Sequence, residues 1–176
     1  MTANTPLIQR RRLLKLGLGA TVLLGVAGAG VALLKPGLVE GRLSAPASSL
    51  MRAVAAAVFE GLLPADAAAR EARLDAHMKR LNDTLAGLPP ALRAELSQVL
   101  ALLCSSGGRL ALTGLASDWA SATPAEVQAT LKTMSLSTLD VRQQIYHALR
   151  DLNTLVFFTD PASWALVGYP GPREMP

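Results

Sequence analysis

The feature that most constrains this 176-residue chain is a repeat of apolar residues at steps of three and four. Four such sets follow one another: Leu50, Val54, Val58 and Leu62; Leu74, Met78, Leu81 and Leu85; Leu92, Leu96, Val99 and Leu103; and Ile145, Leu149, Leu152 and Val156. This spacing places each set on one face of an α-helix. Signals for β-strands are almost absent. The pattern predicts an all-α fold, a small helical bundle of about five or six helices after an N-terminal leader helix.

Turn and capping residues mark the expected ends of these helices. Pro64 ends the first helix, residues 87–90 separate the second from the third, and residues 105–108 end the third. Residues 123–126 (TPAE) form a capping box with proline at the first helical position, which begins a shorter helix. Asp160-Pro161 ends the long helix and a short helix carrying Trp164 follows it.

The N-terminal segment has the composition of an export leader. Basic residues precede nineteen uncharged residues, 16–34, of which five are glycines, and glycine weakens a membrane-spanning helix. Residues 10–15 (RRRLLK) resemble the twin-arginine export signal, which a receptor reads through two guanidinium groups. The signal residues are Arg10, Arg11, Leu13, Leu14 and Lys15. We expect a periplasmic protein exported by the twin-arginine translocase.

The alternative for this segment is a plain N-terminal transmembrane anchor. An uncleaved leader would likewise keep the protein at the inner membrane. Residues 45–47 (APA) supply a cleavage pattern, but a proline lies inside it, so cleavage stays open. We divide the chain into a leader, residues 1–47, and a helical domain, residues 48–176.

Charge argues against a nucleic-acid partner. The chain has 17 Lys and Arg against 13 Asp and Glu, but the basic excess lies in the leader. After Pro46 there are 11 basic and 12 acidic residues, a net charge near −1. The body therefore has no basic surplus with which to hold phosphates, and no nucleic acid is expected as a partner.

The sequence offers little for catalysis. Cys104, the single cysteine, follows a buried-type leucine and is expected to be a small buried hydrophobe. His77 and His147 lack second ligands at helical spacing, so we expect surface or capped histidines and no metal site. No nucleophile elbow, phosphate loop or dinucleotide motif occurs. We expect no catalytic residue and no cofactor bound by this chain.

Aromatic residues concentrate near the C-terminus, where five of the seven lie between Tyr146 and Tyr169. Residues 168–172 (GYPGP) are expected to form a stiff, extended tail. Either the tail packs its aromatic rings back on the bundle or it inserts them into a partner, and both can hold for different rings. The candidate partner-binding residues are Phe157, Phe158, Trp164, Tyr169, Pro170 and Pro172.

The order of these features resembles the gluconate 2-dehydrogenase subunit 3 family. The matching segments are residues 10–15 (RRRLLK), 58–64 (VFEGLLP), 119–126 (WASATPAE), 157–164 (FFTDPASW) and 168–172 (GYPGP). The last two are the most specific, and residues 66–115 match in helical pattern alone. The resemblance implies a small subunit that holds no flavin itself. Its partner would be a FAD-containing dehydrogenase of the glucose–methanol–choline type, often with a c-type cytochrome as electron acceptor.

Two hypotheses of different classes follow. The first is a non-catalytic subunit that binds, stabilises and co-exports the FAD-dependent large subunit. The alternative is a self-sufficient, membrane-anchored periplasmic domain that binds a small apolar ligand between its helices, with the two histidines as polar contacts. The substrate of the partner dehydrogenase is set by its own pocket.

Overall fold

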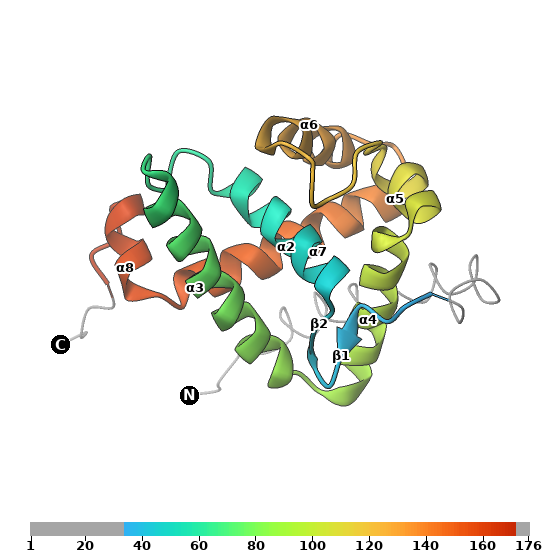
Figure 1. Ribbon diagram of the computed structural model, residues 1–176, viewed down its shortest axis with the longest axis horizontal. Helices are drawn as coiled ribbons and strands as arrows, with labels where there is room; N and C mark the ends of the chain where they lie inside the picture. The colour runs from blue at the N-terminus through green and yellow to red at the C-terminus, as the bar shows by residue number, and fades with distance from the viewer. Residues whose placement is uncertain (1–33, 172–176) are drawn as a thin grey trace, which may run out of the picture.

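The computed structural model describes residues 34–171 and confirms the all-α fold class (Figure 1). Within that range seven α-helices follow a small hairpin, where the sequence predicted about five or six helices. They are α2 (Ala45–Val58), α3 (Ala67–Ala86), α4 (Pro90–Cys104), α5 (Ser106–Thr113), α6 (Pro124–Ser135), α7 (Asp140–Phe158) and α8 (Pro161–Trp164), followed by the 3-10 helix η2 (Ala165–Val167). The export-signal residues Arg10, Arg11, Leu13, Leu14 and Lys15 lie outside the described residues.

Helix α2 is the centre of the bundle and contacts α3, α4, α6 and α7 (Figure 1). Its residues Leu50, Met51 and Val54 are completely buried. Most of the periodic apolar residues of α3, α4 and α7 pack against them in one core cluster, whereas Leu74 of α3 lies in a second, smaller cluster with Phe59 and Phe157. Since the apolar stripes predicted from the sequence are the faces that meet here, hydrophobic burial fixes the arrangement of the long helices.

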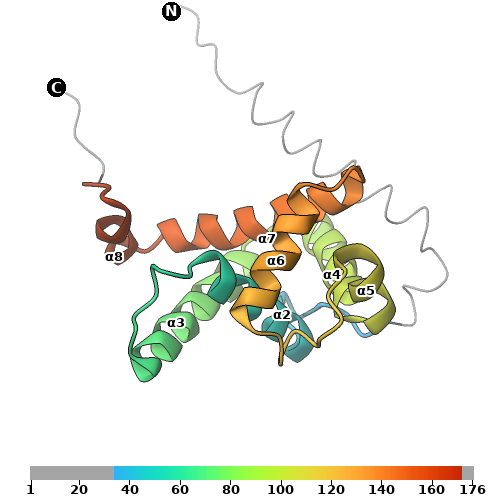
Figure 2. The same ribbon diagram turned by 90° about the horizontal axis from the view of Figure 1, so that it is seen from above.

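Helix α7 runs along the bundle and carries α8 and η2 at its far end (Figure 2). Helix α6 crosses α7 near the opposite end of α7, where the two helices contact each other. The start of α6 is the predicted capping box: the Thr123 hydroxyl accepts from the Glu126 amide, and the Glu126 carboxylate accepts from the Thr123 amide. These hydrogen bonds to the carboxylate lower the pKa of Glu126.

A two-stranded antiparallel hairpin, which the sequence did not indicate, precedes the first described helix. Strands β1 (Leu38–Val39) and β2 (Arg42–Leu43) pair with Leu38 opposite Leu43. Glu40 and Gly41 between them have φ angles of 52° and 80°, as in the tight turns that suit a hairpin. Strands of two residues are too short to produce an alternating pattern, which explains why no strand was predicted here.

The hairpin is bonded to the helical body. The Leu38 amide donates to the Ser97 hydroxyl of α4 at 2.9 Å, and the Leu43 amide donates to Asn82 Oδ1 of α3 at 2.9 Å. Gly37 lies so close to α4 that an added Cβ would stand 2.4 Å from the Leu100 side chain. The packed body therefore begins upstream of residue 48, and Ala47 is already a fully buried core residue of α2.

Among the helices of residues 34–171, none is both long enough and apolar enough to cross a membrane.

Candidate partner-binding surface

The end of α7 divides two neighbouring phenylalanines between the core and the surface. Phe157 is 5% exposed and stacks on Phe59 with ring centroids 4.4 Å apart. Phe158 is 42% exposed. Successive residues on a helix point about 100° apart, so Phe158 points away from the direction in which Phe157 is buried. Phe157 thus supports this end of the molecule from inside, and Phe158 is available to a partner.

The residues after α8 fold back over Trp164. The indole Nε1 of Trp164 donates to the Phe158 carbonyl at 2.9 Å, and the Tyr169 amide donates to the Trp164 carbonyl at 2.9 Å. The Trp164 and Tyr169 rings meet edge to face at 5.5 Å. Gly171, at a φ of 93°, lies so near the indole that a Cβ would stand 3.2 Å from it. The expectation of an extended tail is therefore wrong for residues 168–171.

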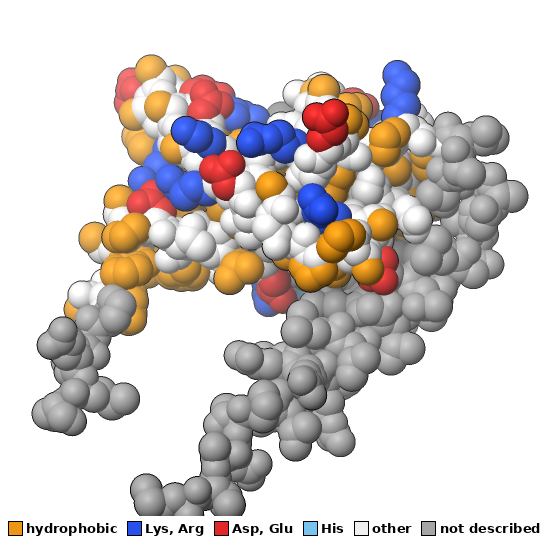
Figure 3. All heavy atoms as spheres, turned by 90° about the horizontal axis from the view of Figure 1, so that it is seen from below, with side chains coloured by type: hydrophobic (Ala, Val, Ile, Leu, Met, Phe, Trp, Pro, Cys, Tyr) orange, Lys and Arg blue, Asp and Glu red, His pale blue; other side chains and the backbone are white. Residues whose placement is uncertain are grey.

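This folding leaves a group of apolar side chains exposed, which we call the C-terminal apolar patch. Its members, on α7, η2 and the following turn, are each between 42% and 59% exposed: Leu155, Phe158, Leu166, Val167 and Tyr169. Figure 3 shows hydrophobic side chains gathered at the α8 end of the molecule, at the left of that view. Exposed apolar side chains are common singly, but a group at one end of a domain is typical of an interaction site.

A polar cluster beneath the patch fixes α8 to α3. Asp160, whose side chain is 15% exposed, forms ion pairs with Arg73 at 3.2 Å and Arg80 at 3.0 Å. Arg73 also donates to the hydroxyl of Ser163, which is fully buried in α8. The Asp160 carboxylate accepts from the Ala162 amide as well, so it caps α8. One carboxylate thus holds three elements together, since α3, α7 and α8 all meet at it.

Beside this cluster, His77 of α3 is buried, so the expectation of a surface histidine is wrong for this residue. It is 3% exposed, and its Nε2 lies 3.0 Å from Oδ1 of Asn153, which is fully buried in α7. Burial lowers the pKa of His77, and Arg80 and Arg73 lower it further, although the Asn153 bond opposes this. The neighbouring charges Asp75 and Lys79 are exposed, and residues two apart lie on opposite sides of a helix, so His77 can be buried between them in the sequence.

The structure brings most of the predicted partner-binding residues together. Phe158, Trp164, Tyr169 and Pro170 lie at the α8 end, with Phe157 beneath them. Pro172 lies outside the described residues.

Three members of the patch were not expected from the sequence: Leu155, Leu166 and Val167. A signal for Leu155 was present, because residues 155–158 (LVFF) are four consecutive apolar residues. Such a run spans more than one face of a helix, so part of it must be exposed.

Groups that could perform chemistry do not gather at this surface. Burial raises the pKa of the Cys104 thiol to about 11, so the reactive thiolate is disfavoured. His147 is exposed on α7, where its ring contacts the neighbouring Tyr146 ring edge to face. Among residues 34–171, no group of three or more His, Cys, Asp and Glu residues is placed to hold a metal ion. The arrangement at the α8 end is suited to binding through apolar contact.

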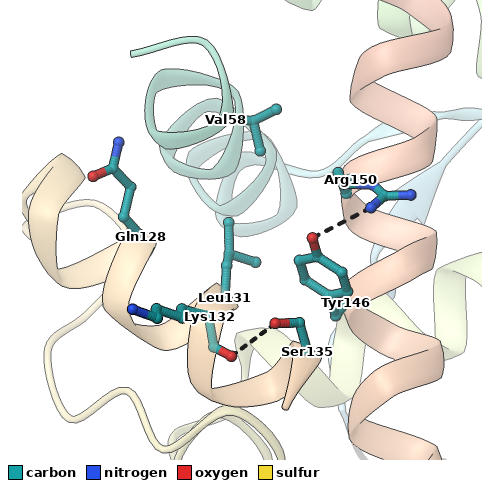
Figure 4. A pocket seen from close by; sticks show the side chains of 7 residues that line it. All are labelled: Val58, Gln128, Leu131, Lys132, Ser135, Tyr146 and Arg150. Atoms are coloured by element: carbon teal, nitrogen blue, oxygen red, sulfur yellow. Dashed lines mark hydrogen bonds between the residues drawn. The ribbon is translucent and has the colours of Figure 1, made fainter.

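A second surface feature lies where α6 crosses α7, and we call it the α6–α7 groove. It has a volume of about 360 Å³ and is drawn in Figure 4. Its lining comes from the end of α2, from α6 and from α7: Val58, Gln128, Leu131, Lys132, Ser135, Tyr146 and Arg150. Neither histidine lines it, so this groove lacks the histidine contacts that the small-ligand alternative anticipated.

Comparisons with protein-family models, with curated proteins and with solved structures found no match for this chain. The resemblance to gluconate 2-dehydrogenase subunit 3 therefore stays a prediction from the sequence.

Proposed function

We propose that this chain is a non-catalytic small subunit that binds, stabilises and co-exports a FAD-dependent dehydrogenase of the glucose–methanol–choline type. The observation that carries the proposal is the C-terminal apolar patch, an exposed group of large apolar side chains on a rigid base. The leader supplies the export part of the proposal, and the sequence resemblance supplies the identity of the partner.

The physical argument rests on what the patch gains when it is covered. Fully burying a large apolar side chain stabilises a complex by about 1.5–3 kcal/mol. Trp164 and Gly171 already fix the turn that carries Tyr169, so little conformational entropy is lost on binding. Aromatic anchors on a preorganised surface are typical of residues that dominate binding energy.

The leader gives such a subunit a second purpose. The twin-arginine pathway carries folded proteins, which suits a partner that must load FAD before export. In this proposal the flavin and the chemistry belong to the large subunit, and a c-type cytochrome accepts the electrons. The complex would lie in the periplasm, against the inner membrane if the leader stays attached.

The test is co-expression of the full chain, with an affinity tag, and a FAD-dependent dehydrogenase of the glucose–methanol–choline type from the same organism. We expect the double variant Phe158→Ser/Tyr169→Ser to lose co-purification of the flavoprotein by about tenfold or more. The matched control is Leu136→Ser, which removes an apolar side chain that is 74% exposed after α6, far from the patch in sequence. An equal loss in both variants, or in neither, contradicts the assignment of the patch.

Export is measured separately, as FAD-dependent dehydrogenase activity in the periplasmic fraction. We expect it to disappear when Arg10 and Arg11 are both changed to Lys, because lysine lacks the planar guanidinium that the receptor reads. Normal export of the flavoprotein with that variant, or without this chain, would show that the escort role is wrong.

A further inference from the structure

The α6–α7 groove has an apolar floor between two helices. Leu131 of α6 is 6% exposed, and Val58 and Tyr146 are half-buried against the main core. Gln128 is fixed at one side, since its Nε2 donates to the Ala57 carbonyl at 3.0 Å. The floor is therefore formed by side chains that the bundle already holds in place, and it can receive apolar groups without reorganising.

The two edges of the floor carry positive charge. Lys132 extends from α6 on one side and Arg150 stands on α7 on the other (Figure 4). Among the ion pairs of residues 34–171, none includes Lys132, and no acidic side chain lines the groove. Arg150 is paired with Asp151, its own neighbour, at 2.7 Å. The net electrostatic preference of the groove is thus for a negative partner, most strongly on the Lys132 side.

The hydroxyl of Tyr146 adds a donor between these charges. It accepts from Arg150 Nη1 at 3.3 Å, so its own hydrogen is free to donate to an incoming carboxylate. A small carboxylate would reach one edge of the groove, because Lys132 and Arg150 stand on opposite sides of the floor (Figure 4). A peptide segment reaches both, with apolar side chains on the floor and acidic side chains along each edge.

We propose that the α6–α7 groove docks an acidic amphipathic segment of a partner protein. The inference rests on the proposed function, in which that partner is the flavin-dependent large subunit. Arg150 and Phe158 are eight residues apart on α7, a rise of about 12 Å, so one partner can cover the groove and the C-terminal apolar patch together.

The direct test uses a defined probe, a fluorescently labelled helical peptide of about 14 residues with leucines at every third or fourth position and flanking glutamates. A matched peptide has every glutamate replaced by glutamine. With the purified full chain, anisotropy is expected to show binding of the glutamate peptide about tenfold or more tighter than the glutamine peptide, and weaker at higher salt.

A groove variant and a control variant test whether the peptide binds in the α6–α7 groove. Lys132→Glu/Arg150→Glu is expected to weaken the glutamate peptide by about tenfold or more, with Lys132→Glu giving most of the loss. The control, Lys79→Glu, reverses an exposed charge on α3 and is expected to leave binding unchanged. Equal affinity for both peptides, or wild-type binding by the groove variant, overturns the proposal.

Other occupants give different results. If the wild-type chain sediments as a dimer and the groove variant as a monomer, the groove is an interface between two copies and the proposal fails. Full displacement of the peptide by benzoate at a similar concentration would show a site for one small carboxylate, which also contradicts it.

Co-purification of the flavoprotein separates this inference from the proposed function. Loss with the patch variant Phe158→Ser/Tyr169→Ser, but not with the groove variant, refutes the groove and leaves the proposed function. If the wild-type chain does not co-purify the flavoprotein while its groove still binds the acidic peptide, the proposed function fails and the groove serves a different acidic partner.

Discussion

The core around α2 and the α8 end of the molecule are held together in different ways. The core is almost entirely apolar, with Leu50, Met51 and Leu81 completely buried. At the α8 end, by contrast, Asp160 joins two arginines and a helix cap, and His77 meets Asn153. Apolar burial is strong but non-directional, whereas hydrogen bonds and ion pairs fix orientation. The comparison suggests that the core provides stability and the α8 end provides a precisely oriented surface.

The largest expected effect comes from breaking the core. Leu50→Ala leaves a cavity among α2 and its neighbours and is expected to cost about 2–5 kcal/mol of unfolding free energy. Urea unfolding of the full chain measures it, with Leu136→Ala, at a site that is 74% exposed, as the control. Similar midpoints for both variants would contradict the central role of α2.

A smaller, local effect is expected when the charge at the α8 end is removed. Asp160→Asn keeps a side chain that caps α8 but abolishes the ion pairs with Arg73 and Arg80, at a cost of about 1–2 kcal/mol. Hydrogen exchange is expected to speed up in residues 161–169 more than in α2. If exchange rises equally in α2 and α8, the two regions are a single cooperative unit.

The buried histidine makes the α8 end sensitive to pH. The folded pKa of His77 lies below its ordinary value of 6.5, so the unfolded chain binds the proton more readily. The stability that neutral His77 contributes is full above pH 6.5 and is lost as the pH falls through 6.5 toward the lower folded value.

Unfolding free energy measured across this pH range is expected to fall less steeply in His77→Gln, because glutamine does not titrate but can donate to Asn153. His147→Gln is the control, because His147 is exposed. A pH dependence that follows His147 instead would contradict the assignment to the buried ring.

The smallest expected effect is at the turn after η2. Gly171→Ala places a methyl group 3.2 Å from the Trp164 ring at a φ of 93°, which is unfavourable for alanine by about 1 kcal/mol. The midpoint of unfolding is expected to change little. The Trp164 ring becomes more solvent-exposed, so its fluorescence emission is expected to shift to longer wavelength. An unchanged spectrum would show that the turn does not depend on this close approach.

The sequence predicted the core better than the surface. The stripes of α3, α4 and α7 follow from apolar spacing, and the capping box fixed the start of α6, because both signals are local. The polar pairs at the α8 end join residues far apart in the chain, 76 positions in the case of His77 and Asn153. No local pattern encodes such a pair, so the prediction that His77 lies at the surface was wrong.

For the candidate site, the sequence indicated the right segment but not its shape. Phe158, Trp164 and Tyr169 were expected in a partner contact, yet the turn at Gly168 and Gly171 that folds them together depends on two positive φ angles. Glycine permits these angles without requiring them, so proline-rich extension was an equally reasonable prediction. The α6–α7 groove could not be predicted from the sequence, because its lining residues come from three helices that are separate in the chain.

The start of α2 has a consequence for proteolysis. Proteases cut exposed, flexible backbone, whereas the bond after Ala47 lies in the first turn of α2 with the Ala47 side chain completely buried. A chain that folds before export would present its alanine–proline–alanine pattern already wound and packed, so the fold itself shields that bond. If the chain is exported as proposed, N-terminal mass analysis of the protein from the periplasmic fraction is expected to find no species that begins at Ser48.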